Sequence, residues 1–150
     1  MKKTSIRLAL AIVFSTLILA GCTKKDGEDQ VDITAQTLAG SYKLTALTYK
    51  NPITGKNEDY LSEMDACEKD DIVTLNANYS ATYTDAGTQC SPNGSYDNAQ
   101  WELDGKNIFI PGSSDDYSGE VKSFNGKTLV IEATYNIGIS VTITATFTKQ

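Results

Sequence analysis

The chain has 150 residues with 19 Asp and Glu against 13 Lys and Arg, which gives a net charge of −6. This acidity argues against binding nucleic acid, and against attachment to anionic lipid through a basic patch. The sequence contains no histidine. A Ser-His-Asp triad, a Cys-His pair and the usual His-ligated zinc or iron site are therefore excluded.

The N-terminus has the pattern of a bacterial lipoprotein signal. Lys2, Lys3 and Arg7 precede an apolar run that ends in Leu19-Ala20-Gly21-Cys22. The run is about a dozen residues long, whereas a membrane span needs about 20. We expect cleavage of a signal peptide at residues 1–21, lipid attachment at Cys22, and a protein anchored in the cell envelope at the outer membrane. An ordinary secretory signal or an uncleaved anchor are the alternatives.

Removal of residues 1–21 would leave 10 basic against 19 acidic residues, a net charge of −9. Residues 22–37 are mostly polar and without periodicity, and we interpret them as a flexible tether before a single domain at 38–150. The acidic cluster Asp26, Glu28 and Asp29 is similar to surface-export signals of some lipoproteins. A solvated linker is the favoured interpretation.

The domain has the spacing of an all-β fold. Asp104-Gly105 and Asn125-Gly126 are pairs that type I′ hairpin turns prefer. One short segment, 58–69, has apolar residues at helical spacing. About eight antiparallel strands with short connections predict an up-and-down barrel or a sandwich. We expect these strands at 41–49, 71–76, 79–85, 96–103, 107–111, 117–124, 127–135 and 139–148.

The last of these strands alternates cleanly between apolar and polar residues. A period of two indicates one buried and one solvated face. We therefore expect the following side chains to point inward: Ile139, Val141, Ile143, Ala145 and Phe147.

Cys67 and Cys90 remain after the lipid-bearing cysteine. An exported location permits a disulfide between them, and this is the favoured interpretation over two free thiols. A nucleophilic cysteine would need a base, and the chain has no histidine to serve as one.

The order of these features resembles the lipocalin-like domain of small bacterial lipoproteins. The resemblance rests on 38–44, on 67–71, on Cys90, on Trp101-Glu102-Leu103 and on 146–149. It implies an eight-stranded barrel with a binding role. Lipocalins begin with Gly-x-Trp, and here Tyr42 occupies the position of that Trp, which closes the barrel floor. The resemblance also implies a basic partner from the last strand, for which Lys149 is the candidate.

Aromatic side chains are the candidate ligand-binding residues. They could stack on a glycan or line an apolar cavity, although ordinary β packing also uses them. Tyr79, Tyr96 and Tyr117 belong to this group, in which we select Trp101, Tyr42, Tyr83 and Tyr135 as the ligand-binding set.

Carboxylates are the other candidates, in Asp70-Asp71 and in Asp115-Asp116 with Glu120. They could bind Ca²⁺ or hydrolyse a glycoside, but their spacing matches no known motif, and solvated turns are favoured. We expect no cofactor and no metal. The sequence thus favours a non-catalytic envelope lipoprotein that binds a small apolar or glycan ligand. A protein-interaction module of the envelope and a carboxylate-based hydrolase are the alternatives.

Overall fold

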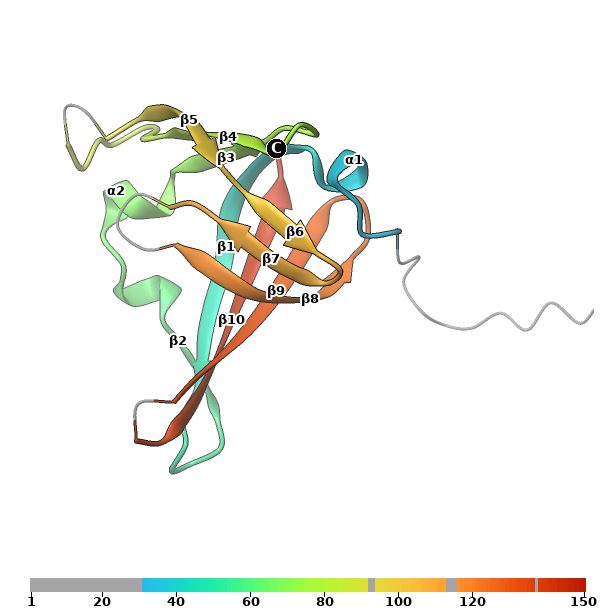
Figure 1. Ribbon diagram of the computed structural model, residues 1–150. Helices are drawn as coiled ribbons and strands as arrows, with labels where there is room; N and C mark the ends of the chain where they lie inside the picture. Colours follow the sequence, from blue (N-terminus) through green and yellow to red (C-terminus); the bar gives the residue numbers. More distant parts are fainter. Residues whose placement is uncertain (1–30, 92–93, 113–115, 137) are drawn as a thin grey trace, which may run out of the picture.

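The computed structural model describes residues 31–91, 94–112, 116–136 and 138–150. The expected signal peptide, Cys22 and the first part of the expected tether lie outside these residues. Within them the chain forms a strongly curved antiparallel sheet with three short helical turns (Figure 1). The elements are α1 (Ala35–Leu38), β1 (Gly40–Lys50), β2 (Asn57–Asp59), η1 (Leu61–Glu63), α2 (Ala66–Lys69), β3 (Ile72–Leu75), β4 (Ser80–Thr84), β5 (Tyr96–Gln100), β6 (Glu102–Asp104), β7 (Asn107–Ile110), β8 (Tyr117–Phe124), β9 (Thr128–Asn136) and β10 (Ser140–Lys149).

The strand order shows how the sheet curls into a barrel. Neighbouring strands follow the order β5-β4-β3-β1-β10-β9-β8-β7-β6, and β2 pairs only with β1. The two ends of this order, β5 and β6, are consecutive in the chain and are separated only by Trp101. One bent strand thus pairs with β4 through its first half and with β7 through its second half. If β5 and β6 are counted as one strand, eight strands form the wall, and the predicted all-β, up-and-down barrel is confirmed.

The hairpins are where the sequence predicted them, but their turns differ in detail. Asp104 pairs with Asn107, so Gly105 and Lys106 are the two central residues of that turn. Gly105 has φ +60°, and no residue but Tyr79 and Asn98 has a positive φ among the described non-glycine residues. A type I′ turn needs a positive φ at both central residues, so the predicted type I′ assignment is wrong here. Glycine at the first central position is the arrangement of a type II′ turn.

The segment with helical spacing, 58–69, is only partly helical. It contains the end of β2, a single 3₁₀ turn at η1 and a single α-helical turn at α2. Backbone hydrogen bonds explain the break, because the Tyr60 amide donates to the Leu47 carbonyl and holds the segment against β1. Leu61 and Met64 then pack against the hydrophobic core as the pattern suggested.

Residues before the predicted boundary at Leu38 also pack on the barrel. The Val31 amide donates to the Phe124 carbonyl, and Thr34 caps α1 through its side chain. Ala35 and Leu38 of α1 are buried in the core. The last residues of the expected tether are therefore part of the barrel's packing. No helix among the residues described is both long and apolar enough to cross a membrane.

The inward face of β10 agrees with the predicted alternation, except at its start. Ala145 and Phe147 are buried, whereas Val141 and Ile143 are half-buried. Ile139 precedes β10 and is 54% exposed, so its predicted inward position is wrong. The reason is that the β9–β10 hairpin extends beyond the barrel wall, as Figure 1 shows at the lower end of β10.

Candidate functional site: a cavity at the α2 end of the barrel

The barrel interior is filled at one end and hollow at the other. The fully buried side chains that do not line the cavity include Leu38 of α1, Trp101 and large aliphatic and aromatic residues of β3, β7, β8 and β9. Towards α2 a cavity of about 970 Å³ opens between β1, β3, β4, β9 and β10. Its wall is largely apolar and includes Leu44, Leu47, Val73, Ile131, Ile143 and Phe147.

Tyr42 forms the floor between the two ends. Its side chain is fully buried, lines the cavity, and donates a hydrogen bond of 2.7 Å to the Leu38 carbonyl. Burial raises the pKa of the Tyr42 hydroxyl well above its usual range, so this group stays a neutral donor. Tyr42 therefore occupies the place that the sequence assigned to it.

Lys149 closes the end of the barrel behind that floor. Its ammonium nitrogen lies 5.6 Å from the ring centre of Tyr42 and 5.2 Å from that of Phe124, and it donates to the Thr37 carbonyl at 2.9 Å. These are cation–π distances. Burial lowers the pKa of Lys149. The predicted partnership of Lys149 with Tyr42 is confirmed.

Three of the four predicted ligand-binding residues line the cavity, and Trp101 does not. Tyr42 is at the floor, Tyr83 lies on the wall, and Tyr135 is at the mouth, where it is 43% exposed. Trp101 is fully buried at the filled end, and its indole N–H donates to the Asn76 carbonyl at 2.9 Å. A side chain fixed there, at the bend between β5 and β6, serves the closure of the barrel. The expectation of a ligand beside Trp101 is therefore corrected.

The other predicted aromatic candidates divide in the same way. Tyr117 lines the cavity and packs edge-on against Phe147, with ring centres 5.0 Å apart. Tyr79 instead packs against Trp101 with the rings tilted by 39° and their centres 5.1 Å apart, and Tyr96 stacks on Tyr83 at 5.2 Å without being part of the lining.

The mouth of the cavity contains residues that the sequence did not single out. Tyr49, Tyr60, Glu63, Met64 and Glu68 all line it. Tyr60 is 48% exposed, so the cavity reaches the surface. The helical spacing of Leu61 and Met64 was the available signal, since it marks a segment with one apolar face that covers an end of the barrel.

Hydrogen bonds fix one side of this mouth. The Tyr49 hydroxyl donates to the Glu58 carboxylate, and the Asn51 amide donates to the same carboxylate at 2.7 Å. These two donors lower the pKa of Glu58, while the hydrogen bond to Glu58 raises the pKa of Tyr49. Tyr49 is thereby held by β2 in the position from which it lines the cavity.

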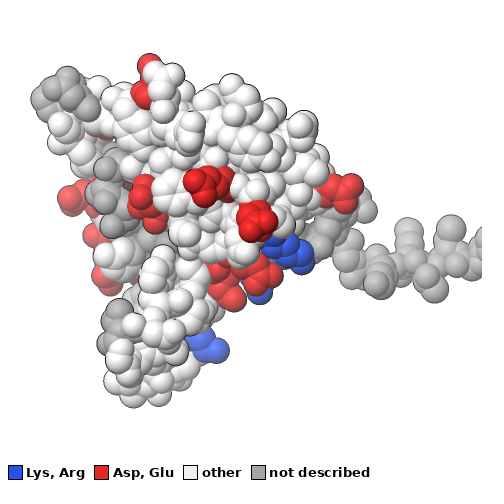
Figure 2. Space-filling model, in the orientation of Figure 1, with Lys and Arg blue, Asp and Glu red and all other residues white. Residues whose placement is uncertain are grey.

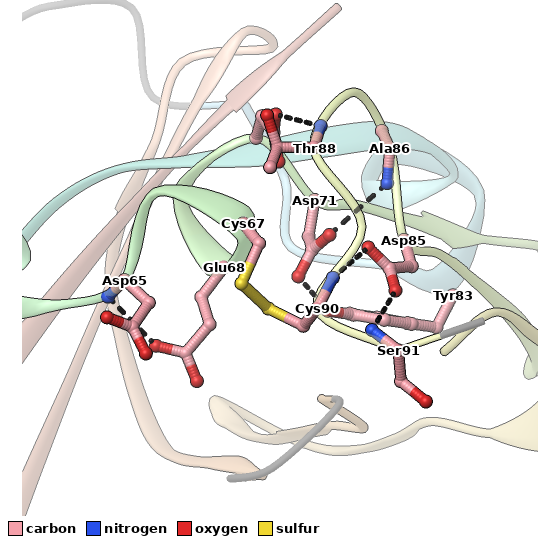
Figure 3. Close-up of a disulfide and its surroundings, with 11 residues drawn as sticks. Asp65, Cys67, Glu68, Asp71, Tyr83, Asp85, Ala86, Thr88, Cys90 and Ser91 are labelled. Carbon is pink, nitrogen blue, oxygen red and sulfur yellow. Dashed lines mark hydrogen bonds between the residues drawn. A yellow bond between two sulfur atoms is a disulfide. The ribbon is translucent and has the colours of Figure 1, made fainter. Parts of the chain in front are cut away.

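The predicted disulfide is present and joins α2 to the loop after β4 (Figure 3). Cys67 and Cys90 have α-carbons 5.1 Å apart. The bridge connects the segment that covers the cavity mouth to the loop between β4 and β5. It therefore restrains Glu68 and Met64, its neighbours on that segment.

Three aspartates hold the same loop through its backbone amides. Asp71 accepts from the Ala86 N–H at 3.3 Å, Asp70 from the Thr88 N–H at 2.9 Å, and buried Asp85 from the Cys90 N–H at 3.3 Å (Figure 3). Burial is the main cause that raises the pKa of Asp71, although the Tyr83 hydroxyl donates to it and opposes the shift.

This network changes the interpretation of the carboxylate pairs. Asp70 and Asp71 are not simply solvated turn residues, because they organise the loop that carries Cys90. Asp116 accepts from the Gly112 amide, Glu120 pairs with Lys122 at 3.3 Å, and Asp115 lies outside the described residues. In the described part of the chain, no three His, Cys, Asp or Glu side chains are arranged to hold a metal ion.

A small antiparallel barrel that is filled at one end and hollow at the other is typical of proteins that enclose one small ligand. The family model of the lipocalin-like domain matches residues 38–131, more than half of the chain. The protein belongs to the lipocalin-like domain family. Neither the curated proteins nor the solved structures contain a match to this chain.

Proposed function

We propose that this protein is a lipid-anchored binding protein of the cell envelope, which takes a small ligand with an apolar body into the cavity at the α2 end. The single observation that carries the proposal is the apolar cavity of about 970 Å³ within a barrel of this family. Attachment through Cys22 at the outer membrane is the part of the proposal that rests on sequence alone.

The size and lining of the cavity support a ligand rather than a packing defect. Pockets for small molecules have volumes of roughly 300–1,000 Å³ and mainly apolar walls with a few polar groups at fixed positions. Leu44, Leu47 and Val73 supply such a wall here, while Tyr60 and Tyr135 give a polar, accessible mouth. A native core normally leaves few voids larger than a water molecule.

A non-catalytic role is supported by what surrounds the candidate acids. Asp70, Asp71 and Asp85 accept hydrogen bonds from backbone amides of one loop. These bonds give the three carboxylates a structural role, since they hold the loop that carries Cys90. The chain also lacks histidine, the commonest general base.

Filling the cavity tests the proposal directly. Ala133 lines the cavity on β9, so Ala133→Phe would place a ring in the space that the ligand needs. Ala46→Phe on β1 is the matched control, because Ala46 is half-buried and is not part of the lining. We expect Ala133→Phe to weaken the binding of the neutral apolar dye Nile red by about tenfold, a loss of about 1.4 kcal/mol.

The dye titration is followed by fluorescence on the chain carrying Cys22→Ser, so that no lipid anchor or detergent competes for the dye. The control variant should bind as the parent does. Equal affinities of the parent and of Ala133→Phe, with both proteins folded by circular dichroism, would refute the cavity as the binding site.

A further inference from the structure

The mouth of the cavity carries charge of one sign. Five carboxylates line it, from η1, from α2 and from the residues that precede α2, β3 and β8: Glu63, Glu68, Asp65, Asp71 and Asp116. No Lys or Arg is present among the described residues of the lining. Figure 2 shows acidic atoms and no basic atoms along the edge where Figure 1 places α2.

The nearby lysines bond to residues that are not part of the lining. Lys69 is the only basic residue on the segment from β2 to β3, and its ammonium group donates to the Ser62 carbonyl at 3.0 Å. Lys149 lies behind the floor at the closed end, bonded to the Thr37 carbonyl. Lys122 pairs with Glu120 and Glu132 on β8 and β9. None of them is among the residues that line the cavity.

Aromatic rings accompany these carboxylates. Tyr49, Tyr60, Tyr117 and Tyr135 line the same cavity between the mouth and the wall. The face of a tyrosine ring attracts a cation that lies within about 6 Å of its centre. Carboxylates and aromatic faces without a competing lysine form a suitable environment for an ammonium group.

An anionic ligand would meet the opposite conditions. A fatty-acid carboxylate at this mouth would lie among like charges and lose part of its hydration, and both effects oppose binding. Burial is the main cause that raises the pKa of Asp71, and the charges of Asp85 and Asp70, which lie outside the lining, add to it. A bound cation would offset that repulsion.

We propose that the ligand is a cationic amphiphile, whose apolar body lies against the cavity wall and whose ammonium head is held by the carboxylates and tyrosines of the mouth. The proposal rests on the proposed function, because it assumes that the cavity takes a ligand. It adds the chemical class of the head group, and it disfavours fatty acids and other anionic amphiphiles.

Three probes with the same alkyl chain separate head-group charge from apolar binding: decyltrimethylammonium, decyl glucoside and decanoate. Each is titrated below its critical micelle concentration into the full chain carrying Cys22→Ser, by isothermal titration calorimetry. We expect the cation to bind at least about tenfold more tightly than decanoate, with decyl glucoside between them. Added salt should reduce the difference, because the mouth is accessible to solvent.

Two double variants, each of which removes two negative charges, show whether the preference for the cation arises at the mouth. Glu63→Gln/Glu68→Gln removes two carboxylates from the mouth, and glutamine at position 68 can still accept from the Asp65 amide. Glu102→Gln/Asp104→Asn removes two exposed carboxylates from β6, outside the lining. The preference for the cation should fall about fivefold in the first variant and stay unchanged in the second.

The outcomes test the cationic head group separately from the proposed binding of a ligand in the cavity. Equal binding of all three probes, or a preference that falls equally in both variants, would overturn the cationic ligand and leave the cavity as an apolar binding site. Absence of binding for all three probes, with the protein folded, would overturn the proposed function together with it.

Discussion

Removal of the disulfide between Cys67 and Cys90 tests how the cavity mouth is stabilised. The bridge joins residues 23 positions apart. In the chain-entropy account, a loop of this length restrains the unfolded chain enough to stabilise the fold by about 3 kcal/mol. The hydrogen bonds of Asp70 and Asp71 to the same loop do not replace this effect, because they exist only in the folded state.

We therefore expect Cys67→Ala/Cys90→Ala to lose about 3 kcal/mol of unfolding free energy and about 10 °C in Tm. Urea denaturation and calorimetry measure the two quantities, with the reduced parent protein as the matched control. Ligand affinity should also fall, since α2 is released from the loop at the mouth. An unchanged urea midpoint, in a parent whose intact mass shows the bridge, would refute this reasoning.

Three further predictions follow from the anchor, the core and the titration of Asp71. Cys22→Ser should abolish lipid attachment; a variant still processed and membrane-bound like the parent would contradict the lipoprotein assignment. Leu129→Ala should lower the free energy of unfolding by about 3 kcal/mol, and Ile143→Ala beside the cavity by about half of that, because Leu129 is fully buried and Ile143 only half-buried. Equal losses in urea denaturation would show that the interior is not divided into a filled and a hollow end. Burial raises the pKa of Asp71, so the folded state holds this proton more tightly than the unfolded state, and the ionised carboxyl opposes folding above its folded pKa. Asp71→Asn should remove this effect, so its Tm relative to the parent should rise as pH increases above 3.8, the ordinary pKa of the group. A Tm difference independent of pH would contradict the shift.

The sequence predicts the wall of the barrel well, because alternation and turn residues are local signals. Residues 117–124 form β8 within the predicted bounds, and the hairpin at Gly105 has the expected place. Tyr42 and Lys149 could be paired in advance through the family resemblance. Local patterns thus suffice wherever a residue's role depends on its own strand.

The cavity itself could not be predicted in this way. Alternation tells which side chains of β10 point inward, but it does not tell how closely the opposite strands approach. Trp101 and Tyr83 are both aromatic residues of predicted strands, yet Trp101 fills the closed end and Tyr83 lines the cavity. The acidic mouth also depends on the placement of η1 and α2, which a disulfide and long-range hydrogen bonds determine.

The most direct test of the account is a methyl NMR titration of the folded protein with decyltrimethylammonium, and in parallel with decyl glucoside. Leu47 and Val73 line the cavity, whereas Val121 and Leu129 are fully buried and are not among the lining residues. The account predicts saturable shifts at the first pair, with the second pair nearly unaffected. Shifts of equal size at both pairs, or none with either amphiphile, would contradict a ligand site at the α2 end of the barrel.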